Sequence, residues 1–254
     1  MQGFVKKDSI VKTIWGKSDT VLFIFAGASA EFALNKAVDW LYFTGKLPAD
    51  PIGRLFSTVR YARRIVFAPM EEAHEAIDTM RNIHLAIEQN RGFSIPDWAY
   101  RDVLFMLIYY SISSYELLEK KLTDEEKEEV YNVFYRVGDG MGLKELPRNY
   151  MEWLPVRTSH LKADLRKSDY TANLFKQYKK HLGTVRYKVL IEAQKLVVPE
   201  RVKTLLQFNE FSWLKPAVPM YKFSRLIRLD GLIKHLLLPS EYKAQIKELD
   251  IVSG

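Results

Sequence analysis

His84 is the residue whose type and position most clearly allow metal chemistry in this sequence. It lies in the stretch MEEAHEAIDTMRNIHLAIEQN, where apolar residues recur at intervals of three and four. Such spacing places them on one face of a helix, and His84 shares that face with Ile77 and Met80. Burial favours the neutral imidazole, which keeps one nitrogen lone pair available for iron. A hydrogen-bonded core histidine is the alternative that this pattern alone leaves open.

A second polar face precedes His84 by one predicted helix. In DPIGRLFSTVRYARRIVF, Arg54, Thr58, Tyr61 and Ile65 follow one another at spacings of four, three and four. These spacings place the four residues on one helix face. The face would supply a cation and a hydroxyl to a ligand, and we take Arg54, Thr58 and Tyr61 as a candidate cofactor-binding set.

Other charged residues near these two faces have less specific roles. Arg60, Arg63 and Arg64 could reach haem propionates or phosphate groups. For Arg63 and Arg64 we favour a solvated basic edge. His74 lies off the apolar face, beside Asp78, and we expect it to face solvent.

Several other kinds of site find little support. Glu71 and His74 form a single Glu-x-x-His, whereas a di-iron bundle needs two such motifs and two further glutamates. The stretch GDGMG (138–142) lacks the alternating acidic ligands of an EF-hand and is interpreted as a helix terminator. The sequence contains no cysteine, which excludes zinc–thiolate sites and covalent CxxCH haem attachment. No ligand spacing connects the three remaining histidines, His160, His181 and His235.

The elements that must position these residues are predicted to be helical, since apolar spacing of three and four dominates the chain. We expect helices over about residues 19–43, 52–67, 68–92, 94–121 and 123–138, with three or four more across 148–207. Thr123 and the acidic residues after it form a clear helix start. The 254 residues fit a single all-α domain, 1–254, of about nine to eleven helices.

Charge and hydropathy bear on partners and location. The net charge is +7, divided as −2 over residues 1–150 and +9 over 151–254. A basic half suits an anionic partner such as lipid headgroups, although we favour a solvated surface. The longest apolar runs, 20–30 and 103–113, fall short of the roughly 20 residues of a membrane span. With no secretory signal evident, we expect a cytoplasmic protein that does not bind nucleic acid.

Residues 219–239 predict a basic amphipathic helix, which leaves peripheral membrane contact open. Its apolar stripe consists of Leu226, Leu229, Ile233, Leu236 and Leu237, and its positive residues are Lys222, Arg225, Arg228 and Lys234. Docking of this stripe on the protein's own core is the interpretation that we prefer.

The order of these segments resembles the rubber-oxygenase catalytic domain family, which includes the latex clearing proteins and MpaB-type oxygenases. The resemblance rests on four stretches and extends over about residues 20–245: DPIGRLFSTVRYARRIVFAPMEEAHEAIDTMRNIH, IPDWAYRDVLFMLIYYSI, LTDEEKEEVYNVFYRVGDGMGLKELP and LLLPSEYKAQI. The most specific element is Arg-x-x-x-Thr followed by a histidine on the next helix.

This resemblance implies a globin-like helical core that holds haem b. His84 matches the family's proximal iron ligand, and Arg54 and Thr58 match the arginine and threonine that line the distal pocket. Rubber-cleaving members carry a lysine directly before that threonine. This chain has Ser57 there, so we expect no distal lysine ligand.

The family's catalytic acid lies on the preceding helix. Asp39 and Glu31 are the two carboxylates on that predicted helix after Asp19, and the sequence does not decide between them.

The function implied by the resemblance is that of a haem-dependent oxidoreductase of the dioxygenase type. Its substrates would be dioxygen and an apolar, isoprenoid-like (polyprenyl) or lipid molecule. Arg54 and Thr58 would hydrogen-bond bound oxygen as catalytic residues, and His84 would bind the iron. A non-catalytic haem- or lipid-binding helical protein, associated with a membrane surface, is the alternative.

Overall fold

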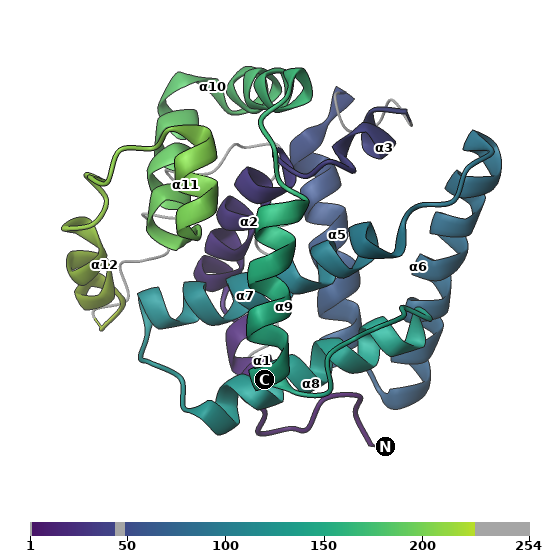
Figure 1. Cartoon of the computed structure of the whole chain (residues 1–254). Helices are drawn as coiled ribbons and strands as arrows, with labels where there is room; N and C mark the ends of the chain where they lie inside the picture. Colours follow the sequence, from purple (N-terminus) through teal and green to yellow (C-terminus); the bar gives the residue numbers. More distant parts are fainter. Residues whose placement is uncertain (1, 44–48, 227–254) are drawn as a thin grey trace.

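The chain folds as an arrangement of helices around a shared core (Figure 1). The computed structural model describes residues 2–43 and 49–226. Within these ranges there is no strand, and the prediction of an all-α fold is confirmed. The helices are α1 (Ile10–Trp15), α2 (Ser18–Phe32), α3 (Val38–Phe43), α5 (Pro51–Phe67), α6 (Met70–Arg91), α7 (Asp97–Leu118), α8 (Asp124–Gly140), α9 (Tyr150–Ala163), α10 (Asp169–Val197), α11 (Glu200–Leu206) and α12 (Ala217–Leu226).

Helices α2 and α7 form the centre of the core and pack closely against each other. A glycine permits this approach, because a Cβ atom at Gly27 would lie 2.2 Å from the ring of Tyr110. Trp15 of α1 is fully buried and donates its indole N–H to Ser111 Oγ of α7 at 3.1 Å. The central pair therefore fixes the positions of the helices that surround it.

The predicted start of α8 is present in full. Thr123 accepts a hydrogen bond from the Glu126 backbone N–H, and the Glu126 carboxylate accepts one from the Thr123 backbone N–H. This capping box satisfies two helix-end donors that would otherwise lack partners.

The expected single helix over residues 19–43 is wrong, because the chain breaks between α2 and α3. Asn35 at the break accepts a hydrogen bond from Ala37 N through its side-chain oxygen and donates one to Asp102 of α7. Neighbouring backbone groups bond to the segment after α9 instead of to the helix, since Lys36 N donates to Asp164 O at 2.9 Å. Tertiary partners thus replace the helical hydrogen bonds of this segment.

Arg63 corrects a second expectation, that of a solvated basic edge. Its side chain is buried, at 7% exposure, and donates to the Trp15 backbone oxygen at 2.7 Å. The carbonyl belongs to the last residue of α1, where helix carbonyls lack an internal partner. Arg64 is exposed, as expected.

The predicted basic amphipathic segment is described only in part. Within α12, Lys222 Nζ donates to the Glu119 backbone oxygen at 3.3 Å and Tyr221 donates to Asp19. The predicted stripe residues Leu229, Ile233, Leu236 and Leu237 lie outside the described residues. None of the described helices is long and apolar enough to cross a bilayer.

Candidate functional site

A cavity of about 280 Å³ lies between α5 and α6, with α2 and α7 lining its inner side. Its lining is largely apolar, and the volume is close to the lower end of the roughly 300–1,000 Å³ typical of ligand pockets. Ile83 and Val103 both line it and are each 37% exposed. The cavity is partly open, and these two apolar residues, from α6 and α7, are exposed parts of its lining.

Helix α5 contributes its predicted polar face to this cavity. Asp50 caps the helix by accepting a hydrogen bond from Gly53 N, and Pro51 occupies the first turn. The four residues chosen from their spacing all line the cavity: Arg54, Thr58, Tyr61 and Ile65. The structure thus brings together the residues that the sequence placed on one face.

The hydroxyls of Ser57 and Thr58 on this helix are already engaged with its backbone. Ser57 Oγ donates to the Arg54 carbonyl oxygen at 2.7 Å, and Thr58 Oγ1 donates to the same oxygen at 3.3 Å. In these rotamers each hydroxyl presents only acceptor lone pairs to a ligand. Thr58 must rotate before it can donate a hydrogen bond into the cavity.

Helix α6 forms the opposite wall, next to α5 and α8 (Figure 1). Ala73 and Ile77 on its inner face are buried, and further along the same face Met80 and His84 line the cavity. His74 is exposed, as predicted. Among the described aromatic residues it contacts Phe4, with the two rings nearly perpendicular. The two histidines of this helix therefore lie in different environments.

The environment of His84 favours its neutral form. Burial lowers its pKa, and the positive charge of Arg54 across the cavity lowers it further, while Glu88 and the Met80 carbonyl oppose this shift in part. The Nδ1 atom is buried and forms no hydrogen bond of regular geometry. Burial also lowers the pKa of Arg54, an effect that Tyr61 opposes. A neutral imidazole and a partly desolvated guanidinium thus share this cavity.

Tyr100 of α7 holds His84 from one side. The two rings meet edge to face, with centroids 5.2 Å apart and planes at 80°. The Tyr100 hydroxyl donates at 3.1 Å to the Glu88 carboxylate, one turn after His84, and the same oxygen accepts from Ile95 N at 2.7 Å. Burial raises the pKa of Tyr100, and Glu88 raises it further, so the hydroxyl stays protonated and bonded.

Arg91 joins the end of α6 to α3. Its guanidinium lies 2.9 Å from the Asp39 carboxylate and 3.9 Å above the centre of the Trp40 ring. Trp40 lines the cavity, whereas Asp39 does not. Asp39, one of the two candidate acids, is therefore bound to an arginine beside the cavity.

Glu31, the other candidate acid, does not line the cavity. Its side chain is fully buried and accepts hydrogen bonds from Arg157 at 2.5 Å and from Tyr110 at 2.8 Å. No aspartate or glutamate lines the cavity in the part of the chain that the structure describes.

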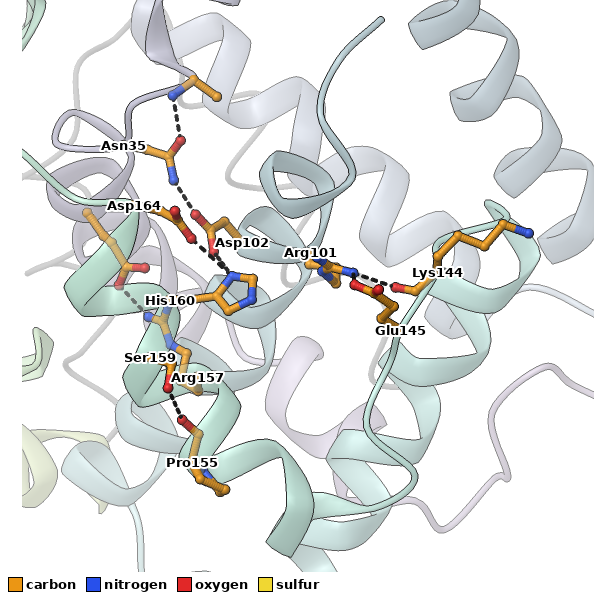
Figure 2. A network of polar contacts seen from close by, with 12 residues as sticks. Asn35, Arg101, Asp102, Lys144, Glu145, Pro155, Arg157, Ser159, His160 and Asp164 are labelled. Atoms are coloured by element: carbon orange, nitrogen blue, oxygen red, sulfur yellow. Dashed lines mark hydrogen bonds and ion pairs between the residues drawn. The ribbon is translucent and has the colours of Figure 1, made fainter.

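The sequence did not reveal a second polar cluster, centred on His160 (Figure 2). His160 Nδ1 lies 2.6 Å from Asp102 Oδ1 and 3.3 Å from Asp164 Oδ2. Asp102 also accepts from the Asn35 amide at 2.6 Å, and Asn35 lines the cavity. The spacing of His160 and Asp164 was available in the sequence, but their approach to α7 was not.

Comparison with known proteins supplies a family. The family model described as ER-bound oxygenase mpaB/B'/Rubber oxygenase, catalytic domain, matches residues 16–231. Comparisons with curated proteins and with solved structures found no match, so the globin-like character of the core stays a prediction. The match covers most of the chain and includes both cavity walls. The chain therefore belongs to the family of the ER-bound oxygenase mpaB/B'/rubber oxygenase catalytic domain.

Proposed function

We propose that this chain is a haem b-binding oxygenase that acts on an apolar, unsaturated substrate of isoprenoid or lipid type, with His84 as the proximal iron ligand. The observation that carries the proposal is the placement of His84, whose pKa is lowered, on the same cavity as Arg54, Thr58 and Tyr61. Rubber oxygenases are in general haem-dependent, and the family match supports oxygen chemistry here.

The residues present fit this cofactor in their chemistry. A neutral imidazole is the form that binds iron, and ligating histidines usually donate their second ring nitrogen to a carbonyl or carboxylate. The Met80 carbonyl, one turn before His84, is suited to that role, because it lies close enough to the imidazole to raise the pKa of His84. The apolar lining suits a macrocycle, and Arg54 is suited to pair with an anionic group.

Bound haem would supply the activation of dioxygen, and the chain's own residues would control its surroundings. Arg54 would donate hydrogen bonds to dioxygen in the cavity, because its guanidinium is partly desolvated on the cavity wall. Thr58 would accept a hydrogen bond from water in its present rotamer and donate one after rotation. Ile83 and Val103 would guide an apolar substrate into the cavity, because they are exposed parts of its lining.

Haem retention tests the role of His84. The wild-type chain should be purified after expression with added haem precursor and scanned for a Soret band, beside His84→Ala and His74→Ala. His74 lies on the same helix but is exposed, so its variant should keep the band while His84→Ala loses it. Circular dichroism confirms that both variants remain helical. A full Soret band in His84→Ala would show that this ligand assignment is wrong.

A non-catalytic haem- or lipid-binding protein is the second candidate. It is favoured by the lack of a carboxylate on the described cavity wall, since Glu31 and Asp39 are both bound elsewhere. Oxygen uptake by the haem-loaded chain with polyprene substrates, measured against a no-substrate control, separates the two. Uptake above the control supports the oxygenase, and equal rates support the binding protein.

A further inference from the structure

Three side chains with metal-ligating atoms converge beside the cavity, two from α9 or directly after it and one from α7 (Figure 2). Their ligand atoms all lie within 4.8 Å of one another. We propose that Asp102, His160 and Asp164 form a binding site for one divalent transition-metal ion, for which Zn²⁺ is the test ion. This site is separate from the iron site proposed at His84 and does not rest on it.

The geometry of the three donors suits such an ion. His160 and Asp164 are four residues apart on one turn, and Asp102 faces them from another helix. Zinc binds histidine nitrogen and carboxylate oxygen at about 2.0–2.2 Å, so its tetrahedral ligand atoms lie roughly 3.3 Å apart. The 3.3 Å between His160 Nδ1 and Asp164 Oδ2 matches this separation. The 2.6 Å contact with Asp102 would lengthen when the metal replaces the Nδ1 proton.

The charge of the cluster also favours a cation. Two carboxylates face one imidazole, with Asp102 Oδ1 at 2.6 Å and Asp164 Oδ2 at 3.3 Å from His160 Nδ1. The neighbouring cations each have their nearest oxygen partner outside the cluster, which is Glu31 for Arg157, Glu145 for Arg101 and the Ala163 carbonyl for Lys36. A divalent ion would neutralise the negative charge of the two carboxylates, and a neutral His160 would carry its proton on Nε2 when Nδ1 binds the metal.

A second layer of contacts already orients the most buried ligand. Asp102 is 2% exposed, and its other oxygen accepts a hydrogen bond from the Asn35 amide at 2.6 Å. Such outer partners fix ligand carboxylates in metal sites. His160 and Asp164 have side-chain exposures of 13% and 16%, so an ion can enter from solvent. Because Asn35 also lines the cavity, the metal would fix part of the cavity wall.

The chain offers a matched control in His74 and Asp78. These residues have the same spacing of four on α6, but both are exposed. Among the described residues, no third ligand group joins them, since the only cluster found is that of Asp102, His160 and Asp164. Any zinc affinity due to the spacing alone would appear equally at both pairs.

Isothermal titration with ZnCl₂ tests the site on the full chain, prepared without a polyhistidine tag and treated with chelator. One ion should bind per chain, and His160→Ala or Asp164→Asn should weaken binding by about 100-fold or more. Asn35→Ser should weaken it by about 10–100-fold, the usual effect of losing an outer partner. His74→Ala should bind as the wild type does. The proposal would be overturned if the wild type showed no saturable zinc binding, or if the His160 and Asp164 variants bound zinc as tightly as the wild type.

Thermal unfolding tests the site without the His160 variant, in case that variant folds poorly. The carboxylates of Asp102 and Asp164 lie within 4.8 Å of each other, and Asp164→Asn removes one of these two like charges at nearly constant shape, so without metal this variant should unfold at or above the wild-type temperature. Zinc should raise the unfolding temperature of the wild type and of His84→Ala, but not that of Asp164→Asn. An equal zinc effect on Asp164→Asn would contradict the site. Loss of haem from His84→Ala with zinc binding intact would separate this test from the proposed oxygenase function.

Discussion

Arg157→Met would remove the positive charge from a buried ion pair between α9 and α2. Arg157 Nη2 lies 2.5 Å from Glu31 Oε2, and the two side chains are 4% and 0% exposed. The Tyr110 hydroxyl donates to the same oxygen at 2.8 Å. After the substitution, the charge of Glu31 would remain buried with Tyr110 as its main hydrogen-bonding partner.

The expected cost follows from this burial. Removing one partner of a buried ion pair costs about 3–5 kcal/mol, because the other charge is left without compensation. For a chain of this length such a loss lowers the unfolding temperature by roughly 10 °C. The pair of Arg101 and Glu145 has the same chemistry at 2.6 Å, but Glu145 is 79% exposed. Glu145→Gln should therefore cost only about 0–1 kcal/mol.

Urea unfolding followed by circular dichroism measures both values. The double variant Glu31→Gln/Arg157→Met should recover at least half of the loss, since it removes the uncompensated charge and keeps an acceptor for Tyr110. The m-values of the variants should agree, so that the free energies are comparable. If Arg157→Met lost no more stability than Glu145→Gln, or if the double variant were as unstable as Arg157→Met, burial of this charge would not govern the cost.

Three further predictions concern packing, backbone and protonation. Gly27→Ala should destabilise the fold by about 1–3 kcal/mol, measured by urea unfolding, because its Cβ would overlap the Tyr110 ring. Gly92→Ala should cost about 1 kcal/mol in the same assay, since φ is +75° at this helix end and the Cβ itself meets nothing within 4 Å. His84 has a lowered pKa in the folded chain, so the unfolded chain binds its proton more readily, and stability should fall as the pH drops below the ordinary histidine value of about 6.5. Unfolding in the acid range should show this loss in the wild type and not in His84→Gln.

Local periodicity was sufficient to predict the two walls of the cavity. Spacing of three and four along a helix fixes which side chains share a face, and it placed Arg54, Thr58 and Tyr61 together on α5 and His84 on the inner face of α6. These relations depend only on helix geometry, which the sequence encodes within each segment. The roles of these residues in cofactor binding depend on the loaded protein and stay predictions.

Features that depend on tertiary partners could not be predicted in the same way. Asp102 and His160 are 58 positions apart, and their contact requires that α7 and α9 cross. The helix break at Asn35 also depends on tertiary partners, because the Asn35 side chain bonds to Asp102 of α7 and the Lys36 backbone N–H bonds to the Asp164 carbonyl at the end of α9. Arg63 was wrongly predicted to be solvated, since a charged residue next to Arg64 suggests an exposed helix face. In the structure the Trp15 carbonyl at the end of α1 supplies a buried acceptor for its guanidinium.

The two cavity walls differ in how firmly they are held. From Arg81 onward, most residues of α6 are exposed. The contacts that hold this part of the helix include the hydrogen bonds that Glu88 accepts and the contacts of Arg91 with Asp39 and Trp40. A partly exposed ion pair contributes about 0–1 kcal/mol and a cation–π contact about 0.5–2 kcal/mol. The α2–α7 side is closed by buried side chains packed at Gly27, where displacement would open a cavity in the core. Because the present volume is small for a ligand pocket, any expansion to admit a larger ligand costs least at the α6 wall, the wall that carries His84.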